Sequence, residues 1–196
     1  AVYHSRRYVN KWKCYMADMA RKQQGLTLIE LMVTLAVAII LVAVGMPLFS
    51  GIVANNRAVA QTNSMVSALN LARSEAVRRG TPVAVCASTT PLPTASPACA
   101  TASPVWTNGW FVFADDDEDG VVDAGETLLR MWDALPANAT VTATSTGSAW
   151  LTFDNAGGAG SMHTLQLGQS DATGTADRCV TVTAPGNIRM ARGNCP

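Results

Sequence analysis

The longest hydrophobic segment of the chain runs from Leu26 to Phe49. Leu, Ile, Val, Ala and Met dominate it, and Glu30 is its one charged side chain. A helix needs about 20 mainly apolar residues to cross the hydrocarbon core of a bilayer. Helices of soluble proteins are rarely apolar on every face for this length. The pattern therefore predicts a transmembrane helix over residues 26–49.

After Phe49 the pattern becomes that of an amphipathic helix. Within residues 50–80, apolar or small residues recur at helical spacing on one face, namely Val59, Thr62, Val66, Leu69, Ala72 and Ala76. Gly80 and Pro82 follow, and these residue types commonly end a helix. We expect this helix to continue the membrane segment and to pack under a globular head.

Residues 81–196 carry strand patterns instead. Eight short runs are rich in β-branched and aromatic residues: PVAVCAS, GWFVFA, TLLRMWDA, TVTATS, AWLTFD, HTLQLG, RCVTVTA and NIRMAR. No long helical pattern interrupts them, which favours antiparallel sheets over βαβ units. Residues 89–104, rich in Pro, Thr, Ser and Ala, are expected to form an exposed loop. The sequence thus predicts an α+β fold, a long helix packed on an antiparallel β-sheet or sandwich.

Glu30 is a costly residue in a membrane helix, because a charge at the bilayer centre costs about 2.5–3.5 kcal/mol. One interpretation is that water and the positive end of the helix dipole lower this cost near the helix start. The other is that Glu30 pairs with a cation supplied by another protein. Spacing alone leaves both open.

The residues before the apolar segment indicate an unusual kind of leader. Arg21 and Lys22 are expected to stay cytoplasmic by the positive-inside bias. An ordinary secretory signal is cut at small residues after its apolar run, whereas here Gly25 lies at the border before the run. Met19 would begin a complete short leader, so residues 1–18 are set aside as either an over-extended start or a segment that is removed.

Residues 25–31, Gly-Leu-Thr-Leu-Ile-Glu-Leu, resemble the prepilin cleavage motif of type IV pilins and type II secretion pseudopilins. The resemblance implies that prepilin peptidase removes residues 1–25 by cutting after Gly25 and then methylates Leu26. It also implies that Glu30 pairs with the terminal ammonium of a neighbouring subunit. Pro47 matches a family proline that bends the membrane helix.

The resemblance extends to the FimT/GspH minor pilins through residues 54–88 and the carboxyl-terminal RCVTVTAPGNIRMARGNCP. It implies a type IV pilin-like fold and a non-catalytic subunit at or near the tip of a type IV pilus. Its partners would be other minor and major pilins or pseudopilins, prepilin peptidase and the bacterial inner membrane, crossed once with the head in the periplasm. The alternatives are a GspH-type pseudopilin of the type II secretion system and a DNA-binding minor pilin of natural DNA uptake. The sequence of residues 67–80 resembles the pilus branch of the family more than the secretion branch, which favours a pilus subunit.

The charge distribution bears on the DNA alternative. Residues 1–25 hold six of the 14 Lys and Arg but one of the 14 Asp and Glu, so the remainder is mildly acidic, unlike a generally basic nucleic-acid-binding domain. DNA-binding FimT-like pilins carry a Gly-Arg-x-Arg motif, and here Asn187 replaces its first arginine. Arg178, Arg189 and Arg192 could still form a small basic patch. The other interpretation is isolated surface arginines that bind DNA weakly and lose it with salt.

Cysteine usage fits an exported domain. Outside the leader, which holds Cys14, four cysteines remain: Cys86, Cys99, Cys179 and Cys195. Four cysteines allow three pairings, of which local closure favours Cys86–Cys99 and Cys179–Cys195. No CxxC or Cys/His spacing suggests a metal, so structural disulfides are the natural interpretation.

One stretch, DDDEDGVVDAGE, has the spacing of a calcium-binding EF-hand loop. The candidate ligands are Asp115, Asp117, Asp119, Asp123, Glu126 and the carbonyl of Val121, with Gly120 at the sharp turn. Such a set could surround Ca²⁺ with about seven oxygens. Because the loop joins two strands rather than two helices, a solvated acidic hairpin is the other interpretation. No cofactor is otherwise required.

Catalysis has little support in the sequence. His163 is the one histidine after the leader, and no GxSxG or HExxH motif gives it a partner. Ser161 and Asp154 are near in sequence, but sequence proximity does not establish a catalytic triad. We therefore expect a protein that is not an enzyme.

Overall fold

The computed structural model describes residues 25–100, 105–143, 149–171 and 174–196. Its helices and strands are α2 (Leu28–Arg79), β1 (Val83–Ala87), η1 (Trp106–Asn108), β2 (Trp110–Ala114), β3 (Leu128–Trp132), β4 (Ala139–Ala143), β5 (Trp150–Phe153), β6 (His163–Asp171), β7 (Gly174–Val182) and β8 (Ile188–Arg192). Each of the eight runs predicted as a strand overlaps one of these strands. The chain divides into two compact units, residues 1–44 and 45–196, and the α+β prediction is confirmed.

In the first unit, every residue of α2 from Leu28 to Val44 is exposed. Within the described residues, α2 is the one helix long and apolar enough to cross a bilayer. Exposed Leu, Ile and Val side chains on all faces are unfavourable in water, so this part of α2 requires lipid or other protein around it. α2 is one continuous helix from Leu28 to Arg79 and so extends through both expected ranges, residues 26–49 and 50–80. The structure therefore shows no boundary between the expected membrane segment and the expected amphipathic segment, and this division stays a prediction.

In the second unit, α2 packs on the head through one face that consists mainly of alanines. The face consists of Ala54, Ala58, Gln61, Thr62, Met65, Ala68, Leu69, Ala72 and Ala76. The sequence prediction was right for Thr62, Leu69, Ala72 and Ala76 but wrong for Val59, which is 37% exposed. Alanines form most of the contact, because small side chains let the helix approach the strands closely. Alanines also give a weak hydrophobic pattern in the sequence, so the packing face could not be predicted fully.

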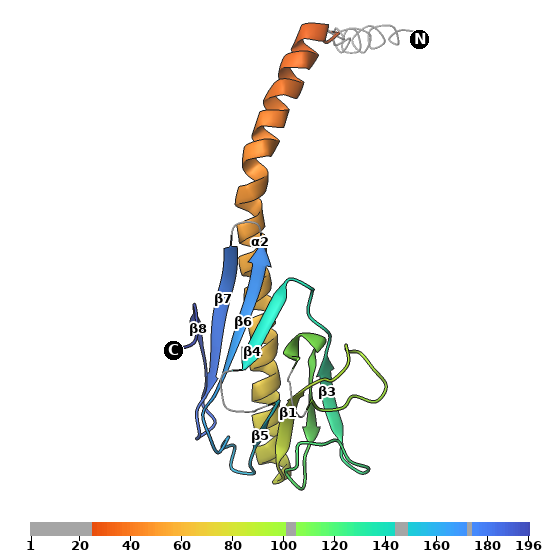
Figure 1. The fold of residues 1–196 in the computed structure, drawn as a ribbon, viewed down its shortest axis with the longest axis vertical. Helices are drawn as coiled ribbons and strands as arrows, with labels where there is room; N and C mark the ends of the chain where they lie inside the picture. Colours follow the sequence, from red (N-terminus) through yellow and green to blue (C-terminus); the bar gives the residue numbers. More distant parts are fainter. Residues whose placement is uncertain (1–24, 101–104, 144–148, 172–173) are drawn as a thin grey trace, which may run out of the picture. The chain divides into compact units, whose positions relative to one another are not determined.

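The strands form two antiparallel sheets, both alongside the carboxyl-terminal half of α2 (Figure 1). The strand order is β3-β2-β1-β5 in one sheet and β4-β6-β7-β8 in the other. One core joins α2 to both sheets, with Val83 and Val85 from β1, Leu165 and Leu167 from β6 and Val180 from β7. Consecutive residues of a strand face opposite sides of its sheet, so the alternate residues of β1 reach a second core.

That second core takes in part of the segment predicted as an exposed loop, residues 89–104. Leu92 is buried beside Ala84, Cys86, Phe111 and Phe113 on the outer face of the first sheet. The Leu92 amide donates to Asn108, and the Leu92 carbonyl accepts from Ala134. Most described residues of this segment are exposed, as predicted, but Leu92, Cys99 and Ala100 are buried. Leu92 and Cys99 cover the sheet because β1 and β2 carry apolar residues on both faces.

Candidate functional site

The segment expected to be cut lies directly before α2. Gly25 and Leu26 are outside regular structure and exposed. A Cβ atom built on Gly25 would meet nothing within 4 Å, so neither packing nor a left-handed backbone requires glycine there. This is the arrangement expected if a separate protein selects the glycine.

Glu30 lies in the first turn of α2. The backbone N–H of Glu30 donates to Oγ1 of Thr27 at 3.3 Å, and that of Leu31 donates to the Thr27 carbonyl. Thr27 therefore caps the helix, and Thr-x-x-Glu is the spacing of a capping box, a signal that the sequence reading missed. The position fits the interpretation of Glu30 as tolerated near a helix start, and pairing with another subunit stays a prediction. Pro47 lies within α2.

The acidic loop connects β2 to β3 and brings most of the predicted calcium ligands together. Carboxylate oxygens of Asp115, Asp117 and Glu126 lie within 4.8 Å of one another, as do those of Asp117, Asp119 and Asp123. Asp115 is buried, and its carboxylate accepts 3.4 Å hydrogen bonds from the Gly120 amide and the Thr152 hydroxyl.

Burial raises the pKa of Asp115, and the nearby Glu126 carboxylate adds to that rise. The other carboxylates hold the loop through its own amides: Glu126 accepts from Asp116 and Asp123, and Asp119 accepts from Val121. A set of ligands made only of oxygen atoms suits a hard cation such as Ca²⁺. The hydrogen bonds from the loop amides to these carboxylates would equally stabilise a hairpin without a metal. The Val121 carbonyl as a ligand stays a prediction.

Gly120 has a structural reason that is independent of any metal. Its φ is +71°, and a Cβ there would lie 2.5 Å from Cε2 of Trp150. Only glycine fits, because a side chain would be strained by the backbone and would clash with the indole ring. The glycine of the calcium-like pattern is therefore no separate argument for calcium.

The three arginines of the predicted basic patch do not share one face. Arg178 of β7 pairs in register with Arg192 of β8, whereas Arg189 pairs with Thr181. Arg178 lies on the face of Val180, which is buried in the main core, and residues at odd spacing point to the opposite face. The prediction of a single patch is therefore wrong for Arg189, which separates from Arg178 and Arg192.

The glycine of the carboxyl-terminal motif also has a packing role. Gly186 has a φ of +81°, and a Cβ there would come within 1.9 Å of the Gly157 carbonyl oxygen. The same oxygen accepts a 3.0 Å hydrogen bond from Nε of Arg73 on α2. Gly186 therefore brings the β7–β8 turn close to the helix, and it need not signal DNA binding.

Both predicted disulfides are confirmed. Cys86 is bonded to Cys99, which ties β1 to the segment covering its outer face. Cys179 is bonded to Cys195, which ties the end of the chain to β7. The Cys195 amide also donates to Oε1 of Gln166, so the carboxyl-terminal residues are held on the outer face of the second sheet.

The serine and histidine that raised the question of catalysis do meet. Ser161 Oγ and His163 Nε2 are 3.0 Å apart, and burial lowers the pKa of His163. The carboxylate of Asp154, however, accepts from the amides of Ala156 and Gly158 and so shapes its own turn. These three residues therefore form a local polar cluster and do not have the geometry of a catalytic triad.

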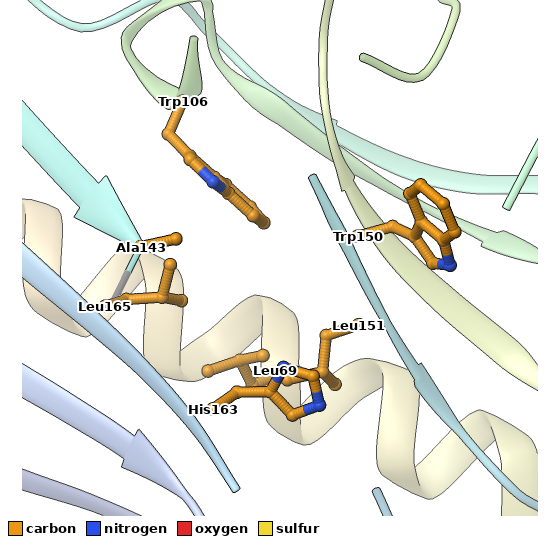
Figure 2. A pocket seen from close by; sticks show the side chains of 7 residues that line it. All are labelled: Leu69, Trp106, Ala143, Trp150, Leu151, His163 and Leu165. Carbon is orange, nitrogen blue, oxygen red and sulfur yellow. The ribbon is translucent and has the colours of Figure 1, made fainter. Parts of the chain in front are cut away.

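A small cavity lies near His163, between the helix and the two sheets. Figure 2 shows the side chains that line it: Leu69, Trp106, Ala143, Trp150, Leu151, His163 and Leu165. Its volume is about 10 Å³, room for about one water molecule. Ligand pockets are typically about 300–1,000 Å³, so this cavity is a packing gap rather than a binding site.

Similarity to known proteins agrees with these features. Residues 61–186 match the family model of type II transport protein GspH, and residues 20–46 match the prokaryotic N-terminal methylation motif. Two crystal forms of the Pseudomonas aeruginosa (strain PAO1) type IV minor pilin FimU are similar, each at 21% identity, with TM-scores of 0.45 and 0.44. They cover 70% and 68% of this chain and 87% and 90% of their own. No curated protein matches the chain significantly.

A long apolar amino-terminal helix, an antiparallel β-rich head and an N-terminal methylation motif together define the type IV pilin-like class. Within this class, the chain belongs to the GspH family, whose model covers more than half of it. It is a minor pilin or pseudopilin.

Proposed function

We propose that prepilin peptidase cuts this chain after Gly25 and methylates Leu26, and that the mature subunit assembles at or near the tip of a type IV pilus. The observation that carries the proposal is the uniformly exposed, apolar part of α2 directly behind the methylation motif. Such a helix is stable in lipid before assembly and among the helices of other pilins afterwards.

Before assembly, the subunit crosses the bacterial inner membrane once. Arg21 and Lys22 stay on the cytoplasmic side by the positive-inside bias, and the head lies in the periplasm. The disulfides Cys86–Cys99 and Cys179–Cys195 support this orientation, because the periplasm is oxidising.

The partners are other minor and major pilins, and the work of the subunit is assembly rather than catalysis. Glu30 meets the terminal ammonium of a neighbouring Leu26 in the filament, which compensates the cost of its charge in an apolar environment. The choice of the pilus over a secretion filament rests on the resemblance of residues 67–80. Loss of pili, with secretion intact, is the result expected when the gene is deleted from its host.

The Glu30 pairing is tested by Glu30→Ala and Glu30→Gln. Both variants should insert in the membrane and lose their leader, since neither step needs the carboxylate, but both should enter filaments much less than the wild type. Thr34→Ala is the matched control, because among the described residues the Thr34 hydroxyl donates within α2, to the Leu31 carbonyl. Immunoblots of sheared pili report incorporation, and normal incorporation of both Glu30 variants would contradict pairing.

A further inference from the structure

Two arginines of the second sheet converge on one residue of the helix. Arg178 Nη2 donates to Oδ1 of Asn55 at 2.6 Å, and Arg192 Nη2 approaches the same oxygen at 3.4 Å. Arg178 and Arg192 are direct cross-strand partners in β7 and β8. Strand pairing and the Asn55 amide therefore hold two guanidinium groups side by side.

The charges of this pair are not balanced within the described residues. Neither Arg178 nor Arg192 forms an ion pair there, since the described ion pairs are those of Arg78 and Arg79 with Glu75. Like charges directly opposite each other on neighbouring strands destabilise a sheet. The amide oxygen of Asn55 orients the two groups but carries no net charge. Two guanidinium groups have spare N–H donors that match the geometry of a phosphate.

The position of the pair along α2 indicates the source of that phosphate. Asn55 lies six residues after Phe49, the last residue of the predicted membrane segment, which is about 9 Å along a helix. The headgroup layer extends about 5–7 Å beyond the hydrocarbon core on each side of a bilayer. In a subunit still anchored in the membrane, Asn55 thus lies about 2–4 Å beyond the headgroup layer. The long side chains of its two arginines can span that distance to the lipid headgroups.

We propose that Arg178 and Arg192, oriented by Asn55, bind the phosphate of an anionic phospholipid while the subunit awaits assembly. Lipid binding holds the head against the membrane surface, and extraction into the filament releases it. The proposal rests on the membrane-anchored state described under Proposed function. A lipid is favoured over DNA because two arginines displace few counterions from a duplex, and Arg189 faces away from them.

The test uses the full chain in nanodiscs of phosphatidylcholine, with or without phosphatidylglycerol. Thermal unfolding of the head is followed by tryptophan fluorescence, because a ligand that binds only the native state raises the midpoint. We expect phosphatidylglycerol to raise it by about 2–4 °C, and high salt to reduce the rise. Carbonate extraction of the chain from vesicles reports membrane anchoring separately, so loss of anchoring is distinguishable from loss of lipid binding.

Substitutions test whether Arg178 and Arg192 cause the rise in the unfolding midpoint. Arg178→Gln with Arg192→Gln should abolish the rise, while Arg189→Gln, which removes the same charge from the opposite face, should keep it. If the double variant does not fold, Arg192→Gln alone, at an exposed edge position, should reduce the rise. An equal rise in wild type and variants would overturn the proposal, as would an equal loss in Arg189→Gln.

Two further additions distinguish other sources of phosphate. Inorganic phosphate or duplex DNA is added to discs of phosphatidylcholine alone. Neither should reproduce the rise, because neither is held at the bilayer surface. A rise with DNA that depends on Arg178 and Arg192, with none from phosphatidylglycerol, would replace the lipid by nucleic acid and overturn the proposal.

Discussion

At the scale of single residues, Asp115 has the least favourable environment among the carboxylates of the acidic loop. It is fully buried, while Asp116, Asp117 and Asp119 beside it are exposed. Burial raises its pKa, so the folded state holds a proton more tightly than the unfolded state does. Stability therefore falls as the pH rises above 3.8, the ordinary pKa of an aspartate. A cation at this position would offset that loss.

The calcium interpretation predicts a stabilisation that Asp115→Asn with Glu126→Gln removes. Extracellular sites bind calcium at about 10⁻⁴–10⁻³ M, and calcium at ten times its dissociation constant would stabilise the head by about 1.4 kcal/mol. Calorimetry of the full chain in detergent, with and without millimolar calcium, measures the shift. Asp116→Asn is the control, because Asp116 belongs to neither carboxylate cluster.

The calcium effect should also weaken in mildly acidic buffer, because protons compete for Asp115. In calcium-free buffer at neutral pH, Asp115→Asn alone should raise the melting temperature, since it removes a buried charge. Absence of any calcium response in the wild type would leave the loop as a solvated hairpin.

The sequence identifies the three arginines of the predicted basic patch, but it does not show how they are arranged in space. Arg178, Arg189 and Arg192 are visible as cations near a shared disulfide. Which of them meet depends on the register of β7 and β8 and on Asn55, which is more than a hundred positions away in sequence. Strand alternation alone would have separated Arg189 from Arg192, because they are an odd number of residues apart.

At the scale of elements, the strands were easier to predict than the packing face of the helix. β-Branched and aromatic residues mark most of the strands, because these residues fit the pleated surface of a sheet. The face of α2 is built largely from alanines such as Ala58, Ala68 and Ala72, whose hydrophobic signal is weak. Val59 and Val77 stand out more in the sequence, yet both are exposed.

The carboxyl-terminal turn of α2 carries a charge cluster that predicts a pH effect. Glu75 accepts from Nε of Arg78 at 3.1 Å and from Nε of Arg79 at 2.9 Å, and these bonds lower the pKa of Glu75 to about 2. A lowered carboxyl pKa stabilises the fold above its unfolded value of 4.5, and this contribution is lost as the pH falls from about 4.5 to about 2.

Glu75→Gln should therefore lower the melting temperature slightly at neutral pH and not at all near pH 2. Because the ion pair lies at the surface, where the Arg78 side chain is 63% exposed, the expected loss is only about 0.3–0.5 kcal/mol and is reduced by salt. The measurement compares the two melting temperatures across the pH range, and Arg57→Gln, an exposed arginine of the same helix, is the control. A difference that stays constant with pH would contradict the assignment.

At the scale of the whole molecule, the two units make different demands on their surroundings. Residues 45–196 enclose an apolar core and two disulfides, which suit a folded domain in water. Residues 28–44 expose apolar side chains all round and need lipid or other helices. The sequence predicts this contrast well, because the contrast depends on local composition. Packing between distant segments, such as Leu92 against β2, depends on the tertiary fold and could not be predicted in this way.

The central claim, that the chain is a processed pilin, is tested most directly by the amino terminus of the mature protein. Mass spectrometry of the membrane-extracted form should find a chain that begins at Leu26 with one added methyl group. Gly25→Val should leave the leader attached and the head folded, because a Cβ at Gly25 meets no neighbour within 4 Å. A mature chain that begins at Met46 or beyond would show an ordinary signal peptide and contradict the account.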